Sequence, residues 1–250
     1  MQPTTRAAPA APQRRSFHMG LARVLNRFSR ILLVPRCLAC GEVGHDGLDL
    51  CVTCHAQLPW NLLACRQCGI AMPDARLSRC GACQIDPPPF SHAFCPLHYR
   101  FPIDRLLPRF KFHGDLAAGA LLATLMQWPV DPADLPDALV PVPLHRSRLR
   151  TRGYDQALEL ARALGHGLGL PLNAHALQRS RATQAQTELG AVERKHNVSG
   201  AFELRPGARL PTHVALVDDV MTTGATLAEC ARVLLTGGVQ RVDAWTIARA

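Results

Sequence analysis

Long apolar runs are absent from this chain of 250 residues. The longest clean ones, such as Ile31–Val34, fall far short of the roughly 20 residues that a spanning helix needs, so we expect no membrane span. Hydrophobic residues make up 48% of the chain and charged residues 19%, and the mean hydropathy is +0.02. These values are ordinary for a soluble globular protein and argue against global disorder.

Two nucleotide-binding signatures are also missing. The chain contains neither G-x-x-x-x-G-K-[ST] nor G-x-G-x-x-G, which argues against a P-loop nucleotidase and a dinucleotide-dependent oxidoreductase. A secretory signal is missing as well, because Arg23, Arg27 and Arg30 interrupt the apolar stretch near the N-terminus. We therefore expect a cytoplasmic protein whose thiols stay reduced.

Acidic residues are missing from the first 36 positions, which hold seven arginines. The net charge of the whole chain is +9, so most of the excess lies in this arm. Residues 1–16 are expected to be disordered, and the apolar spacing from Leu21 to Leu32 predicts a basic amphipathic helix. Such an arm suits a nucleic acid or a membrane surface, and the alternative is a helix that docks on the next domain.

Cysteine, by contrast, is abundant, and eight of the ten cysteines form four C-x-x-C pairs. These pairs are Cys37 and Cys40, Cys51 and Cys54, Cys65 and Cys68, and Cys80 and Cys83. Zn²⁺ prefers four soft ligands in a tetrahedron, and a two-residue spacer lets both sulfurs of one turn reach the metal. The pattern predicts two structural Zn²⁺ sites within residues 37–86.

Pairing in sequence order closes the shorter loops, and a cross-braced arrangement is the alternative. Redox-active C-x-x-C is the rival chemistry, but such motifs open the helix of a βαβ unit, whereas these pairs lie in turn-rich sequence. The remaining cysteines, Cys95 and Cys230, are expected to be packed thiols.

The chain changes character after the linker Asp86–Phe90. Apolar helical patterns, such as Tyr154–Leu168 and Ala225–Leu235, alternate with short β-like runs, such as Ala138–Val142 and Val214–Val217. Strands separated by helices of this length predict an α/β domain with a parallel sheet over residues 90–250.

One β-like run ends in two adjacent acids, Asp218 and Asp219. A hydroxyl-rich loop follows, formed by Thr222, Thr223, Gly224, Ala225 and Thr226, and then a helix begins. Ligands bind at the carboxyl ends of strands in open parallel sheets. The threonine hydroxyls and the positive helix end can hold a phosphate dianion, and the two carboxylates can accept hydrogen bonds from the vicinal hydroxyls of a ribose. A capped Asp-Asp turn without a ligand is the alternative.

This stretch resembles the phosphoribosyl-pyrophosphate (PRPP) motif of type I phosphoribosyltransferases. The resemblance implies a Rossmann-like sheet in which Asp218 and Asp219 bind the ribose hydroxyls while residues 222–226 bind the 5′-phosphate. Further segments, including Phe110–Asp115, Val140–His145 and Arg152–Gln156, resemble the ComF family, which joins a double zinc ribbon to such a domain. The family implies Mg²⁺ with PRPP, and single-stranded DNA and competence DNA-processing proteins as partners. Asp155 departs from the family, which more often has Asn there, and is not counted among the site residues.

Cationic and polar residues elsewhere are candidates for the pyrophosphate and for a closing lid. They are Lys111, Arg146, Arg152, Arg181, Gln186 and Arg194. The arginine run from Arg146 to Arg152 follows a predicted strand, where a pyrophosphate loop would lie, and its alternative is a solvated basic edge. Lys111 is equally well explained as a surface lysine.

Two functions are compatible with these features. One is an active phosphoribosyltransferase that transfers phosphoribose to a base or an amine, although the sequence shows no general base for an acceptor. The other is a protein of DNA uptake whose zinc ribbons and basic arm bind single-stranded DNA, with PRPP as a bound ligand. Aromatic residues are only 5% of the chain, so stacking platforms for bases are sparse and DNA binding would be mainly electrostatic.

Overall fold

The computed structural model describes residues 34–181 and 198–250. The predicted basic helix, Gln186 and Arg194 lie outside this range. In the described part, no helix combines the length and the apolar character needed to cross a bilayer.

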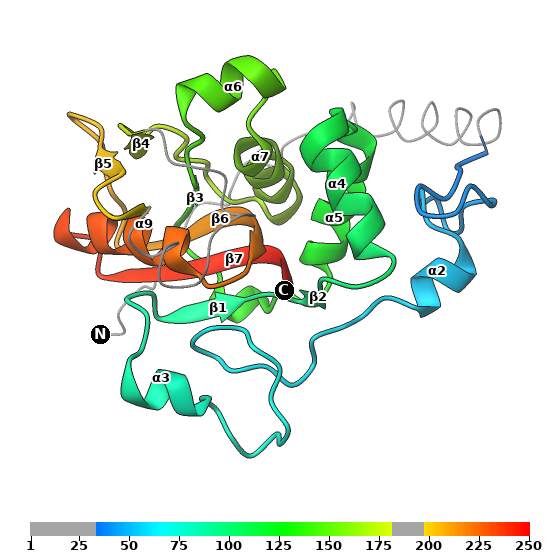
Figure 1. Ribbon diagram of the computed structural model, residues 1–250, viewed down its shortest axis with the longest axis horizontal. Helices are drawn as coiled ribbons and strands as arrows, with labels where there is room; N and C mark the ends of the chain where they lie inside the picture. Colours follow the sequence, from blue (N-terminus) through cyan, green and yellow to red (C-terminus); the bar gives the residue numbers. More distant parts are fainter. Residues whose placement is uncertain (1–33, 182–197) are drawn as a thin grey trace, which may run out of the picture.

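A parallel sheet with the strand order β1-β7-β6-β3 forms the centre of the molecule, and β2 extends the β7 pairing (Figure 1). Its strands are β1 (His92–Phe94), β2 (Leu97–His98), β3 (Ala138–Pro141), β6 (His213–Met221) and β7 (Arg241–Arg249). Every pairing in this sheet is parallel, so the predicted fold class is confirmed. A separate antiparallel pair joins β4 (Leu177–Arg179) to β5 (Phe202–Leu204).

Helices cover both faces of the sheet. α4 (Ile103–His113), α5 (Leu116–Gln127) and α7 (Gln156–Leu168) cover one face, and α9 (Ala225–Thr236) covers the other. The 3₁₀ turn η1 (Pro132–Asp134) and helix α6 (Arg146–Arg152) bury none of their residues. Side chains alternate along a strand, so Ala215 and Val217 of β6 face the cluster built by α4, α5 and α7. Val214 and Leu216 face the cluster that contains α9.

The cysteine-rich segment carries two short helices, α2 (Val52–Ala56) and α3 (Gly81–Ile85). Its first half shares a hydrophobic cluster with α4 and α5, to which it contributes Leu50 and Leu58. Arg109 of α4 donates a hydrogen bond to the carbonyl oxygen of Leu38, which fixes this half against the α/β domain. The second half is held by the Ala93 N–H of β1, which donates to the carbonyl oxygen of Arg66 (2.8 Å).

Close packing between α4 and α5 makes Gly119 sensitive to substitution. A Cβ atom there would lie 2.5 Å from the ring of the buried Phe110. Overpacking of about 1 to 3 kcal/mol outweighs the gain in helix propensity of about 1 kcal/mol, so we expect Gly119→Ala to lower the free energy of unfolding in urea.

Gly167→Ala in α7 is the matched control. The three atoms nearest to a Cβ there all belong to the far end of the Gln127 side chain, which can move aside. We expect this variant to be as stable as the wild type or more so, and a similar loss in both variants would contradict the packing argument.

Candidate functional site

A cavity of about 340 Å³ lies at the carboxyl ends of β3 and β6. Asp218, Asp219, Thr222 and Thr226 line one side of it. The other walls come from the end of α4, the segment after β3, helix α6 and the start of α7. The cavity is therefore built where the chain leaves the strands of a parallel sheet and where such sheets bind ligands.

The two carboxylates lie within β6 and not beyond its end. The strand continues to Met221, and Asp218 pairs in register with Thr246 of β7. Asp219 is buried, and its carboxylate lies 2.6 Å from the ammonium of Lys111. Lys111 is thus an ion-pair partner of the acidic pair and not a freely solvated surface lysine.

Charge governs the protonation of this group of side chains. Burial together with the neighbouring Asp219 carboxylate raises the pKa of Asp218 from 3.8 to about 7, although the Lys111 charge acts in the opposite direction. Burial opposes the charge on Lys111, but the attraction of Asp219 outweighs it and raises the pKa of the ammonium. Near pH 7 Asp218 therefore gains or loses its proton, while the Lys111 ammonium beside the pair stays charged.

The loop after β6 is turned by Gly224. Its φ of +76° is left-handed, a conformation that side chains other than glycine rarely adopt, and it precedes α9 as the N-cap. The Ala225 N–H donates to the hydroxyl of Thr223 (3.4 Å), and the first turn of α9 presents further N–H groups toward the loop. Thr222 and Thr226 line the cavity, whereas Thr223, Gly224 and Ala225 shape the turn behind it.

Some of the predicted cationic residues line the cavity and others do not. Arg152 lines the cavity, together with Arg148 and Arg179, which were not among the candidates. Arg146 does not line it, and Arg181 donates to the Ser199 carbonyl oxygen (2.8 Å) outside it. Residues 146–152, where a pyrophosphate loop was expected, fold as helix α6, which places alternate arginines on different sides.

Asp155 is a site residue that the sequence reasoning left out. It caps α7 by accepting from the Leu158 N–H (3.2 Å), accepts from the Leu144 N–H (3.1 Å) and lines the cavity. Burial raises its pKa despite both donors. The signal for it was an Asp directly before a helical pattern, which is a typical N-cap.

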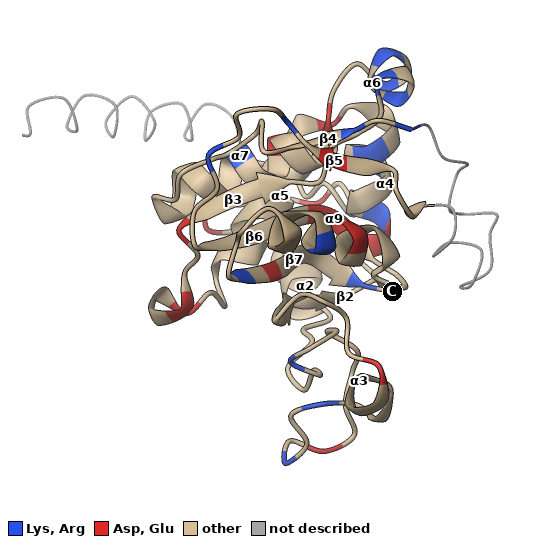
Figure 2. Cartoon of the chain, turned by 90° about the vertical axis from the view of Figure 1, so that its left-hand side faces the viewer, with Lys and Arg blue, Asp and Glu red and all other residues tan. Residues whose placement is uncertain are grey.

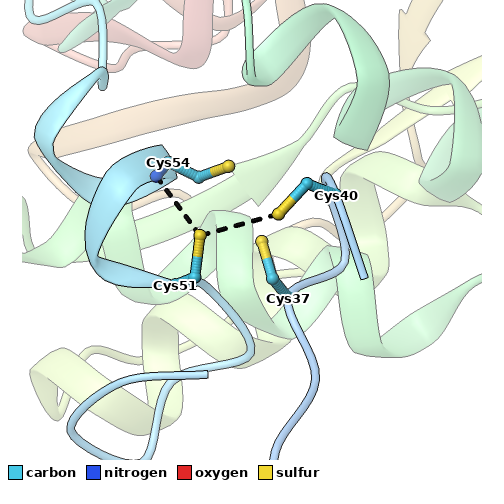
Figure 3. A group of neighbouring side chains, drawn as sticks. All are labelled: Cys37, Cys40, Cys51 and Cys54. Carbon is cyan, nitrogen blue, oxygen red and sulfur yellow. Dashed lines mark hydrogen bonds between the residues drawn. The ribbon is translucent and has the colours of Figure 1, made fainter. Parts of the chain in front are cut away.

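Two four-cysteine clusters hold the N-terminal segment together. Their members are Cys37, Cys40, Cys51 and Cys54 in one cluster, and Cys65, Cys68, Cys80 and Cys83 in the other. Figure 3 shows the four side chains of the first cluster, with the sulfurs of Cys40 and Cys51 3.6 Å apart. The pairing in sequence order is confirmed, and the cross-braced alternative is wrong.

The geometry of both clusters fits Zn²⁺. Bonds of about 2.3 Å in a tetrahedron separate neighbouring sulfurs by about 3.8 Å, close to the 3.6 Å between Cys40 and Cys51 and the 3.7 Å between Cys68 and Cys80. Burial alone would raise the pKa of Cys37, but backbone N–H groups outweigh it and lower the value to about 6. Four thiolates this close need a cation to offset their mutual repulsion.

Cys95 and Cys230 are buried apart from these clusters, as expected for packed thiols. Cys230 lies in α9, and the Cys95 sulfur accepts from the Thr246 hydroxyl (3.1 Å).

Comparisons with known proteins agree with this architecture. The family model of the double zinc ribbon domain matches residues 28–96. DNA utilization protein YhgH of Salmonella typhimurium is 35% identical over 209 residues, which cover 80% of this chain and 90% of that protein. Competence protein F of Haemophilus influenzae is 34% identical over 224 residues, which cover 86% of this chain and 97% of that protein. The chain belongs to the ComF family.

A less similar protein also matches over most of the chain. Competence protein ComFC of Streptococcus pneumoniae is 22% identical over 228 residues, which cover 86% of this chain and 100% of that protein. The similarity to these ComF proteins spans both the zinc-ribbon segment and the α/β domain.

The raised pKa of Asp218 predicts a pH dependence of stability. Since the folded protein keeps this proton up to about pH 7 and the unfolded chain loses it near 3.8, the stabilisation is complete below about pH 4 and is lost as the pH rises toward 7. We expect one aspartate carboxyl ¹³C resonance to titrate near pH 7 in the wild type and to be missing in Asp218→Asn. Lys111→Met should move its midpoint to higher pH.

Asp74→Asn is the control for this titration, because the hydrogen bonds from Arg76 lower the pKa of Asp74 below its ordinary value. That variant should lose a resonance at acidic pH and keep the one near 7. A wild-type spectrum in which every aspartate titrates below pH 5 would contradict the charge balance described here.

The two cysteine clusters predict two zinc ions per chain by elemental analysis. Cys51→Ser should retain one zinc, because the second cluster is independent of the first in its ligands. Cys230→Ala removes a cysteine that belongs to neither cluster and should retain both ions. Loss of both ions in Cys51→Ser would show that the clusters do not bind metal separately.

Proposed function

We propose that this protein acts in DNA uptake and that its cavity binds PRPP together with Mg²⁺. The first part is supported by the relatives, which are named for competence and for DNA utilization. The second part rests on one observation, which is that a carboxylate pair, two threonines and a group of cationic side chains line the same cavity. A volume of about 340 Å³ is in the range of small-molecule sites.

Each chemical group of PRPP would have its own partners among the side chains of the cavity. Asp218 and Asp219 would accept hydrogen bonds from the two ribose hydroxyls, and the acidity of the site would select a neutral, hydroxyl-rich moiety there. Thr222 and Thr226 would donate to the 5′-phosphate, which the N-terminus of α9 also attracts. Arg152 and Arg148 would face the pyrophosphate across the cavity.

The ion pair between Lys111 and Asp219 would change when the ligand binds. Its ammonium neutralises Asp219 in the ligand-free protein, so a ribose hydroxyl that donates to Asp219 competes with the lysine. The released ammonium would then lie beside the pyrophosphate, where its charge is favourable. Mg²⁺, when bound with PRPP, supplies further positive charge to the pyrophosphate oxygens.

Single-stranded DNA binding, assisted by the zinc ribbons and the basic arm, is the part of the proposal that accounts for DNA handling. The net charge of +9 supports an attraction to phosphate backbones. The other candidate is an active phosphoribosyltransferase of nucleotide metabolism without a DNA role. The two differ in turnover, since only the enzyme releases pyrophosphate from PRPP when a suitable base or amine is present.

Calorimetry with PRPP and Mg²⁺ on zinc-loaded protein tests the ligand. We expect Asp219→Asn to bind about 10 to 100 times more weakly, because hydrogen bonds to a charged acceptor contribute about 1.5 to 3 kcal/mol each. Asp74→Asn, which alters a partly exposed acid of the second ribbon, should bind as the wild type does. No heat with the wild type would refute the ligand. Release of pyrophosphate that Asp219→Asn abolishes would favour the enzyme.

A further inference from the structure

Two exposed aromatic rings line the cavity, and a third lies just before the start of α4. Among the described residues, Phe112, Tyr99 and Phe101 are 61%, 39% and 37% exposed. Tyr99 and Phe112 line the cavity, and Phe101 lies two residues after Tyr99, just before α4. A fourth ring, Trp128, is 45% exposed but packs against His55 of the first ribbon. Rings left in water at one edge indicate a surface that a partner covers.

Arginines accompany these rings. The Arg152 guanidinium lies over the Phe112 ring, 5.4 Å from its centre, and Arg105 lies 6.0 Å from the centre of Phe101. Arg146 and Arg150 extend the positive charge along α6, which Figure 2 shows as a basic helix. In the part of the chain that the structure describes, neither these two nor Arg105 pairs with an acidic side chain.

Two arginines elsewhere in the α/β domain are paired with acidic residues of their own helix. Arg162 and Arg232 lie on α7 and α9, and each pairs with a glutamate three residues before it. Their charge is therefore offset within their own helix, whereas among the described residues no acidic side chain pairs with Arg105, Arg146 or Arg150.

We propose that single-stranded DNA binds along this basic–aromatic rim, which consists of Tyr99, Phe101, Arg105, Phe112, Arg146, Arg150 and Arg152. Cations interleaved with open rings suit a chain of phosphates that carries unpaired bases, because each base can stack on a ring while the arginines follow the backbone. The bases of a duplex are stacked on one another and present no face to the rings. An acidic peptide would use the arginines but leave the rings uncovered.

This inference rests on the proposed DNA role and names the surface that would contact the strand. It assigns the contact to the α/β domain, beside the sugar-phosphate cavity, in addition to the ribbons and the arm. A strand on the rim passes the cavity mouth, because Tyr99, Phe112 and Arg152 belong to both the rim and the cavity wall.

Fluorescence anisotropy with a labelled single-stranded oligonucleotide of about 20 nucleotides tests the rim on the full chain. We expect the double variant Phe101→Ala, Phe112→Ala to bind about tenfold more weakly or worse, because base stacking on a ring is lost. The double variant Arg146→Gln, Arg150→Gln should reduce the steepness of log K against log salt by about 1.4, at about 0.7 for each phosphate contact.

Trp128→Ala and Arg162→Gln are the matched controls, since they remove an exposed ring and an arginine away from the rim. They should bind the strand as the wild type does. Circular dichroism and two zinc ions per chain establish that every variant is folded. Rim variants that keep wild-type affinity and salt dependence would overturn the rim and leave the DNA role intact. A duplex that binds as tightly as the single strand would overturn it as well.

Calorimetry with PRPP on the Phe101→Ala and Arg150→Gln variants separates the two proposals, because neither residue lines the cavity. Normal heat from PRPP with weakened strand binding supports the rim. A wild-type protein that binds no strand refutes both the rim and the DNA role, whatever its heat with PRPP.

Discussion

The site depends on the balance of charge at the carboxyl end of β6. Two adjacent carboxylates on a central strand repel each other and lose hydration, and an isolated buried charge of this kind costs several kcal/mol. Lys111 offsets one of them from the neighbouring helix α4, and the proton on Asp218 offsets much of the other. The cavity is therefore kept open and polar without the unfavourable energy of two uncompensated anions.

This balance also explains why α4 matters to a site whose motif lies more than a hundred residues away. The helix buries Leu106 and Phe110 against the sheet face, so its last turn is held in place, and Lys111 follows directly. Gln156 of α7 donates to the Lys111 carbonyl oxygen (3.2 Å) and accepts from Arg152 (3.2 Å). Three helices thus meet at the acidic pair through side chains that restrain one another.

Local patterns were sufficient to predict the parallel α/β architecture and the two cysteine clusters. The equal spacing of the cysteine pairs and the alternation of apolar periods depend on neighbours in sequence, and both were confirmed. The ion pair between Lys111 and Asp219 could not be predicted from local patterns, because only the packing of α4 brings these two residues together. The choice of Arg148 over Arg146 likewise depends on the direction in which each side chain leaves α6. The low aromatic content did not predict that Tyr99 and Phe112 line the same cavity.

The first zinc ribbon is not a separable appendage. Leu50 and Leu58 lie in the same hydrophobic cluster as the buried face of α4, and Arg109 of α4 contacts the ribbon backbone. Metal loss in the ribbon would thus expose apolar surface on the helix that carries Lys111 and Phe112. In a cell short of zinc, the cavity and the rim would then lose their structure together with the ribbon. The supply of zinc would thus limit the amount of folded protein.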